Sequence, residues 1–174
     1  MVHYRRSRVP GGTFFFTVAL RDRSEHTLVE HVHALRRTIQ NVRERRTFAI
    51  DAMVILPDHL HAVWTLPTGD SDYSGRWRAI KSGFVRCLRA QGISLSANSK
   101  GEYDVWQRRF WEHQIRDEAD LARHVDYVHI NPVKHGLVER AIDWQWSTFH
   151  RYVRMKILPP DWAMATDVRG DYGE

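Results

Sequence analysis

Two strand-like segments joined by only two residues constrain the fold of this chain more than any other feature. Residues 48–56 (FAIDAMVIL) and 59–66 (HLHAVWTL) are apolar runs of strand length, and the Pro57-Asp58 dipeptide between them is typical of a turn. Strands with so short a connection pair side by side in antiparallel fashion. The sequence therefore predicts a β-hairpin in this part of the chain.

The segments around the hairpin alternate between strand and helix patterns. In chain order the expected elements are a strand at 13–20, a helix at 28–46, the hairpin, a helix at 76–91, a strand or bent pair of strands at 105–116, a helix at 117–131 and a short helix at 146–156. The 117–131 helix is expected to begin after Asp117 as its cap and to stop before Pro132. This order predicts an α+β fold, a ferredoxin-like antiparallel sheet with helices on one face, and the other face is left free for a ligand.

Length and charge narrow the class of protein. A chain of 174 residues favours a single domain over residues 1–174, with a basic N-terminal arm (1–12) and a C-terminal extension (about 140–174). Lys and Arg number 26 against 21 Asp and Glu, which gives a net charge of +5. An Arg-rich domain favours a nucleic acid partner, because guanidinium groups suit bidentate contacts to phosphate. The same charges are equally compatible with a solvated surface.

Several kinds of chemistry and location are disfavoured by what the sequence lacks. Cys87 is the single cysteine, which rules out an internal disulfide and a cysteine-based zinc site. The sequence contains neither a glycine-rich phosphate-binding loop nor a Gly-x-Ser-x-Gly nucleophile elbow. The first residues are polar and basic, unlike a signal peptide, and the longest apolar run, 14–20, is too short to span a bilayer. We therefore expect a soluble cytoplasmic protein with no membrane partner.

The histidine pair His59 and His61 is the first candidate site. Residues i and i+2 of a strand share one face, so both imidazoles are expected opposite Leu60, Ala62 and Trp64, which face the core. Two imidazoles spaced in this way can converge on one metal ion. Taken alone, such a pair is more often two solvated histidines on an exposed strand face.

Tyr127 and Asn131 form the second candidate. The 117–131 helix is expected to bury Leu121, Val125 and Val128. Tyr127 is displaced from this apolar stripe, and Asn131 lies one turn below it. A tyrosine over an amide, beside a histidine pair on a sheet, is a workable arrangement of nucleophile and metal. A partly buried tyrosine with its hydroxyl bonded to a polar neighbour is the alternative interpretation.

Longer blocks of sequence connect these candidates. Residues 56–61 (LPDHLH) and 127–138 (YVHINPVKHGLV), with 109–113 (RFWEH) and 146–150 (WSTFH), resemble the REP-associated tyrosine transposases. That family belongs to the single-tyrosine, histidine-hydrophobic-histidine (HUH) group of bacterial insertion-sequence transposases. The resemblance covers roughly residues 4–162, and its Tyr-x-His-x-Asn-Pro-Val block is the most specific part. Asn131 stands where the related mobile transposases carry Gln, and its shorter amide side chain reaches less far.

The resemblance implies a metal-dependent endonuclease and strand transferase for single-stranded DNA. Mg²⁺ or Mn²⁺ would be held by His59 and His61 with help from Asn131. Tyr127 would attack a scissile phosphate beside a hairpin-forming repeated extragenic palindrome, leaving a 5′-phosphotyrosine and a free 3′-OH. Because the covalent link conserves the energy of the phosphodiester, no ATP is needed, in agreement with the missing phosphate loop.

Single-stranded hairpin DNA is the partner that follows from the resemblance, bound by a monomer or a homodimer associated with the nucleoid. Basic residues alternate with aromatic ones at 4–6, 76–78 and 108–111, which suits phosphate contact and stacking on unpaired bases. The side chains that we expect to contact DNA are Tyr4, Arg5, Arg6, Arg8, Arg78, Lys81, Arg108 and Arg109.

Two other functions remain open at this point. The chain could be a self-mobilising insertion-sequence transposase, or a regulator that binds hairpin DNA without catalysis. The intact His59, His61 and Tyr127 argue against the regulator. An RNA-binding domain of the same shape ranks last, because it would need aromatic residues on the open face of the central strands.

Overall fold

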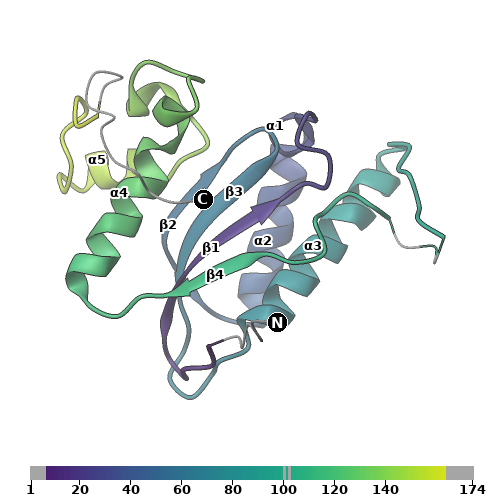
Figure 1. Cartoon of the computed structure of the whole chain (residues 1–174), viewed down its shortest axis with the longest axis horizontal. Coiled ribbons are helices and arrows are strands. Elements are labelled where there is room, and N and C mark those ends of the chain that lie inside the picture. The colour runs from purple at the N-terminus through teal and green to yellow at the C-terminus, as the bar shows by residue number, and fades with distance from the viewer. Residues whose placement is uncertain (1–6, 100, 102, 164–174) are drawn as a thin grey trace, which may run out of the picture.

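The computed structural model describes residues 7–99, 101 and 103–163, and it contains one four-stranded sheet with helices on both sides (Figure 1). The elements in chain order are β1 (Thr13–Ala19), α1 (Thr27–Glu30), α2 (Val32–Arg45), β2 (Ala49–Ile55), β3 (His59–Thr65), α3 (Tyr73–Ala90), β4 (Trp111–Gln114), α4 (Glu118–Lys134), the 3₁₀ turn η1 (Ala141–Asp143) and α5 (Phe149–Arg154). The strand order is β2-β3-β1-β4 and all pairings are antiparallel. The predicted hairpin and the α+β class with a ferredoxin-like antiparallel sheet are confirmed. None of the helices in the described residues combines the length and the apolar character needed to cross a membrane.

The main core lies between the sheet and the helices α2 and α3. Alternation along β3 places Leu60, Ala62 and Trp64 on this side, where all three are completely buried. Trp64 stacks on Trp77 of α3 with the ring centroids 4.1 Å apart, and Phe84 extends the same apolar stripe of the helix. Large buried rings contribute much of the energy of such a core. The sheet is therefore a rigid support for whatever lies on its other face.

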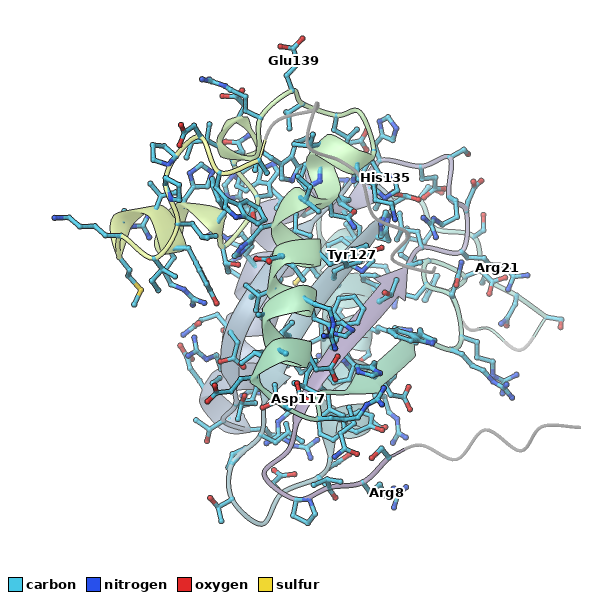
Figure 2. The ribbon with its side chains drawn as sticks, turned by 60° about the vertical axis from the view of Figure 1, so that its left-hand side comes forward. Arg8, Arg21, Asp117, Tyr127, His135 and Glu139 are labelled. Atoms are coloured by element: carbon cyan, nitrogen blue, oxygen red, sulfur yellow. The ribbon has the colours of Figure 1, made fainter. Side chains whose placement is uncertain are left out.

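The opposite face of the sheet, predicted to be free, is partly covered by α4. Phe15, Val54 and Val63 point to this side and form a second buried cluster with Val125 and Val128 of α4. The strands carry apolar residues on both faces, so a helix on the second face is needed to remove them from water. Figure 2 shows α4 crossing in front of β2 and β3, with β1 and β4 beside it. The prediction that helices lie on one face and leave the other free for a ligand is corrected in this respect, since α4 covers part of the second face.

Helix α4 continues to Lys134 instead of stopping before Pro132. A proline in the last turn removes one backbone hydrogen bond, which is tolerable when the next residues still bond normally. The amide of His135 donates to the carbonyl of Asn131 at 3.0 Å, and Gly136, with φ +66°, ends the helix. Asn131 therefore lies within a regular turn of α4.

The other element boundaries follow the prediction with local differences. The helix expected at 28–46 is divided into α1 and α2 at His31. Helix α3 begins earlier than expected because the side chain of Asp72 caps it, accepting a hydrogen bond from the amide of Gly75 at 2.7 Å. Only four residues of the segment 105–116 form a strand, β4. The site described below depends on β1, β3, β4 and α4.

The segment after α4 covers the edge of the sheet at β2. The backbone of Ile55 donates to the carbonyl of Trp146 at 2.9 Å, and the amide of Thr148 donates to the carbonyl of Met53 at 2.8 Å. The indole of Trp144 adds a hydrogen bond of 2.9 Å to the carbonyl of Ile55. These contacts satisfy backbone groups that an edge strand would otherwise leave open.

Candidate active site

Strand β3 places His59 and His61 on the face that α4 covers. Their ring centroids are 4.9 Å apart, and the residues are only 2% and 1% exposed. Burial lowers the pKa of His59 although its hydrogen bond to the carboxylate of Asp58 opposes the shift, and burial holds the pKa of His61 well below its usual value. Both imidazoles are therefore neutral at neutral pH, and the alternative of a solvated pair does not apply.

In each histidine the Nδ1 atom contacts a neighbouring side chain, whereas the Nε2 atom has no hydrogen-bond partner among the described residues. The Nδ1 atom of His59 lies 2.8 Å from Oδ1 of Asp58, and the Nδ1 atom of His61 lies 2.9 Å from the hydroxyl of Thr17. Both Nε2 atoms are buried and have no hydrogen-bond partner among the described residues. Buried polar atoms are rarely left in this state, and metal-ligating histidines are typically oriented through the second nitrogen. The pair has the donor set expected of a metal site.

Helix α4 brings Tyr127 against this pair. The Tyr127 ring meets the His61 ring edge-on, with the centroids 5.1 Å apart, and Phe15 contacts both rings at 5.7 Å and 5.5 Å. Figure 2 shows Tyr127 on the side of α4 that is turned towards β1. Asn131, one turn further on, is completely buried, and neither atom of its amide has a hydrogen-bond partner in the described part of the chain. Tyr127 therefore contacts the histidine pair on β3, and Asn131 is buried one turn further along the same helix.

Positive groups surround the site. Arg23 pairs with the carboxylate of Asp58 and its Nη2 lies 3.3 Å from Nδ1 of His59. The ammonium of Lys134 lies 5.0 Å from the centroid of the Tyr127 ring. An anionic substrate is attracted to such a site. Sequence reasoning missed Arg23, which follows β1 in a polar turn and carries no distinguishing pattern of its own.

The predicted DNA-contacting residues fall into three groups. Tyr4, Arg5 and Arg6 lie outside the described residues. Arg8 and Arg109 are exposed and lie outside the groove formed by the remaining residues. The remaining residues line a groove of about 680 Å³ between α3 and the segment before β4; its cationic lining residues are Arg21, Arg78, Lys81, Arg86, Arg89 and Arg108.

One of the three basic-aromatic motifs proves to be structural. Arg76 is 1% exposed, and its guanidinium binds the carboxylate of Asp70 at 2.6 Å and the carbonyl of Thr47 at 2.8 Å. Trp77 beside it is completely buried in the main core. Neither side chain is available to DNA, because both are buried and hold the beginning of α3 in place. Arg78, the next residue, is exposed.

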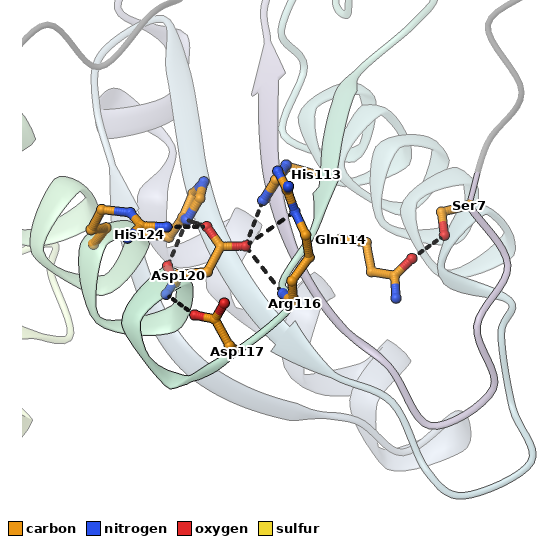
Figure 3. A network of polar contacts seen from close by, with 8 residues as sticks. Ser7, His113, Gln114, Arg116, Asp117, Asp120 and His124 are labelled. Atoms are coloured by element: carbon orange, nitrogen blue, oxygen red, sulfur yellow. Dashed lines mark hydrogen bonds and ion pairs between the residues drawn. The ribbon is translucent and has the colours of Figure 1, made fainter.

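A second histidine cluster lies on the same face of the sheet (Figure 3). Asp120, 4% exposed, binds Nε2 of His113 at 2.9 Å and lies 3.3 Å from Nδ1 of His124. It also accepts hydrogen bonds from the backbone of Arg116 and the side chain of Arg123. Burial favours a raised pKa for Asp120, but the hydrogen bonds from His113 and the Arg116 amide outweigh it and lower the pKa to about 2.

This second cluster could hold a metal ion by its geometry, since its three ligand atoms lie within 4.8 Å of one another. It differs from the His59–His61 pair because the carboxylate of Asp120 already accepts several hydrogen bonds. Sequence reasoning missed it, although the residues form a recognisable spacing of seven and four between the end of a strand and the first turns of a helix. Asp117 and Asp120 together cap that helix, the amide of Asp120 donating to Asp117 at 2.7 Å.

The fold and the site together define the class: an α+β protein whose antiparallel sheet carries a buried histidine pair in contact with a tyrosine of a crossing helix. No protein-family model matches the chain. It is 47% identical, over 94% of its own length and 92% of the relative's, to the REP-associated tyrosine transposase of Escherichia coli K12. It is 42% identical to a putative REP-associated tyrosine transposase of Haemophilus influenzae, over 98% of this chain and 99% of that one. The solved structure of a REP-associated tyrosine transposase bound to a REP hairpin superposes with a TM-score of 0.84 at 47% identity, covering 100% of this chain and 98% of that one. The chain belongs to the REP-associated tyrosine transposases.

Proposed function

We propose that the protein is a metal-dependent endonuclease and strand transferase that cleaves and rejoins single-stranded DNA at the foot of hairpin-forming extragenic palindromes. The observation that carries the proposal is the position of Tyr127 against His61, with the Nε2 atoms of both histidines buried and without a partner in the described residues. The relatives support the choice of substrate, since one of them is solved with a REP hairpin.

The donor set suits a divalent cation. The Nε2 atoms of His59 and His61 and the amide oxygen of Asn131 would hold Mg²⁺ or Mn²⁺, with phosphate oxygens and water as further ligands. Such an ion polarises a phosphoryl oxygen and stabilises the leaving 3′-oxygen. Imidazole is a softer ligand than Mg²⁺ prefers, so Mn²⁺ is expected to support activity better.

Tyr127 acts as the nucleophile. Its phenolic oxygen forms a bond to phosphorus while the bond between phosphorus and the 3′-oxygen breaks. The phenol releases its proton to water and the leaving 3′-oxygen takes up a proton from water, which leaves a 5′-phosphotyrosine and a 3′-OH. Attack of a 3′-OH on the phosphotyrosine reverses the step and rejoins the strand. The positive charges of Lys134 and Arg23 attract the scissile phosphate to this position.

The basic groove beside α3 is proposed to receive the phosphate backbone of the hairpin stem. Arg78, Lys81 and Arg108 line it, and the arm residues 4–8 and Arg109 are proposed to add contacts outside it. Phe110 lines this groove while Trp111, the next residue, packs on Phe15 of the Tyr127 face. A strand that leaves the groove around β4 therefore arrives on the face that carries Tyr127.

A gel assay tests the chemistry. A labelled hairpin with a single-stranded foot is incubated with Mn²⁺ and the wild-type protein, the Tyr127→Phe variant or the control Tyr152→Phe. Tyr152 is a half-buried tyrosine that packs against the same apolar cluster as Tyr127, but its hydroxyl donates to the carbonyl of Asp51 at 3.1 Å. We expect a protease-sensitive DNA adduct with wild type and with Tyr152→Phe, lost in EDTA and in Tyr127→Phe. Binding without any adduct in the wild type would indicate a non-catalytic regulator.

Salt dependence of binding tests the groove. Arg78→Ala combined with Arg108→Ala removes two phosphate contacts, so the slope of log K against log salt should fall by about 2. The matched control removes Arg37 and Arg45, which are exposed on α2 away from the groove. If the slope fell equally in the two double variants, the hairpin stem would not bind in this groove.

A further inference from the structure

Trp111 is an exposed aromatic residue on the edge strand of the sheet. Among the described residues, five large apolar side chains are strongly exposed, and Trp111, at 49%, is the one aromatic residue of this group. It opens β4, the outermost strand of the order β2-β3-β1-β4. Its half-exposed indole offers a large, flat apolar surface to a ligand at the sheet edge.

The register of the sheet places Trp111 in line with the candidate active site. Thr17 of β1 pairs with His61 on one side and with Trp111 on the other, so the three residues form one row across the sheet. Neighbouring strands are about 4.8 Å apart, which puts Trp111 roughly 10 Å from His61. Directly paired residues point to the same face, and the edge contact of Phe15 with Trp111, at 5.6 Å, confirms this for the indole.

The plane of the indole is fixed before any ligand arrives. Trp111 lies nearly parallel to His113, with an interplanar angle of 8° and centroids 6.0 Å apart, and His113 is stacked on His124 at 14° and 4.6 Å. Asp120 holds the His113 ring through the 2.9 Å contact visible in Figure 3. A ring supported in this way loses little conformational entropy when it binds a flat partner.

The charges around Trp111 select the partner. Arg108 and Arg109 precede it and are exposed, and Arg116 follows β4 with its side chain 75% exposed. The acidic residue beside it, Glu112, is buried and contacts the hydroxyl of Tyr73 on the other side of the sheet. A flat aromatic surface with exposed arginines on both sides of it in the chain matches a nucleobase on a phosphate backbone.

We infer that Trp111 is the stacking platform for one unpaired base in the single-stranded foot of the hairpin. Stacked bases are spaced by about 3.4 Å along a strand, so the base lies within about three nucleotides of the phosphate that Tyr127 attacks. This inference rests on the proposed function, because it assumes that the strand passes the Tyr127 face.

Binding in EDTA, without cleavage, tests the platform. The Kd of a hairpin with its single-stranded foot and of the same hairpin with a blunt end is measured by fluorescence anisotropy for the wild type, Trp111→Ala and Trp111→Phe. We expect Trp111→Ala to weaken the footed hairpin roughly 5- to 100-fold and to leave the blunt one unchanged, with Trp111→Phe close to wild type. Met155→Ala, which removes another exposed apolar side chain, serves as the control and should change neither Kd.

An abasic scan of the foot completes the test. Removing the base that stacks on Trp111 should reproduce the loss in the wild type and cause no further loss in Trp111→Ala. Equal affinities of wild type and Trp111→Ala for the footed hairpin would overturn the inference and leave the proposed function intact. A change of oligomeric state in Trp111→Ala would assign the indole to a protein contact and also overturn it. A wild-type protein that bound neither hairpin would remove the proposed function itself.

Discussion

Two histidine clusters share one face of this sheet and differ in how their polar atoms are satisfied. The first comprises His59 and His61 with Asn131, all at most 2% exposed, and their Nε2 and amide atoms have no hydrogen-bond partner in the described chain. The second comprises His113 and His124 around Asp120, whose carboxylate accepts hydrogen bonds from two arginines as well as from histidine. Within one fold, the polar atoms of the first cluster therefore lack hydrogen-bond partners among the described residues, whereas the carboxylate of the second has several.

This difference in hydrogen bonding suggests different roles for the two clusters, ligand binding for the first and structural support for the second. A buried donor or acceptor without a partner is unfavourable, and it persists where a ligand supplies the missing interaction. A buried carboxylate that is hydrogen bonded from several sides instead fixes the elements that carry its partners. We infer that the first cluster takes a cation and that the second ties the beginning of α4 to β4, thereby fixing the helix that presents Tyr127.

The largest effect is expected when the histidines of each cluster are removed in turn. His59→Ala with His61→Ala should abolish Mn²⁺ binding and DNA cleavage, since it deletes the ring nitrogens of the proposed metal site. His113→Ala with His124→Ala should leave Mn²⁺ affinity within about threefold of wild type, because its metal ligands are unchanged. Calorimetric titration with Mn²⁺, with folding checked by circular dichroism, gives both answers. A reversed outcome would exchange the roles of the two clusters.

Sequence reasoning could find the first cluster because its residues sit in repeating elements. Strand alternation gives the common face of His59 and His61, and the helical repeat places Tyr127 and Asn131 one turn apart. The contact between strand and helix followed only from the family resemblance. No local sequence pattern predicts that α4 crosses the second apolar face of the sheet, because this contact depends on packing between segments that are distant in sequence. For the same reason the cluster around Asp120 was not foreseen.

A smaller effect is expected from the residue that orients His61. Thr17→Val keeps the shape of the side chain and removes the hydroxyl that lies 2.9 Å from Nδ1 of His61. Loss of such an outer contact typically lowers metal affinity by about 10- to 100-fold, so cleavage should recover at high Mn²⁺. Thr13→Val on the same strand is the matched control, because its hydroxyl bonds to Thr65 at 2.7 Å instead. If both variants needed the same Mn²⁺ concentration as wild type, His61 would not be a ligand oriented by Thr17.

The smallest effect concerns the stability that the second cluster provides. Asp120→Asn removes the negative charge that accepts hydrogen bonds from His113 and the Arg116 amide, and we expect it to lower the free energy of unfolding by about 1–3 kcal/mol at pH 7. Asp143→Asn breaks an exposed pair with Arg140 and should leave the free energy of unfolding close to that of wild type, because water and salt screen such a pair. Urea unfolding of the three proteins measures both values.

The pH dependence of that difference identifies its origin. The pKa of Asp120 is lowered in the folded state from 3.8 to about 2, so the ionised carboxylate stabilises the fold fully above pH 4. As the pH falls from about 4 to about 2, the carboxyl becomes protonated in the folded state too, and the advantage of wild type over Asp120→Asn should disappear. The urea midpoints of the two proteins should therefore converge over this range. If they stayed apart by the same amount, the loss in Asp120→Asn would come from packing, and the second cluster would not act through its charge. If Mn²⁺ raised the midpoint of wild type but not of Asp120→Asn, the second cluster would bind the cation and its contrast with the first would fail.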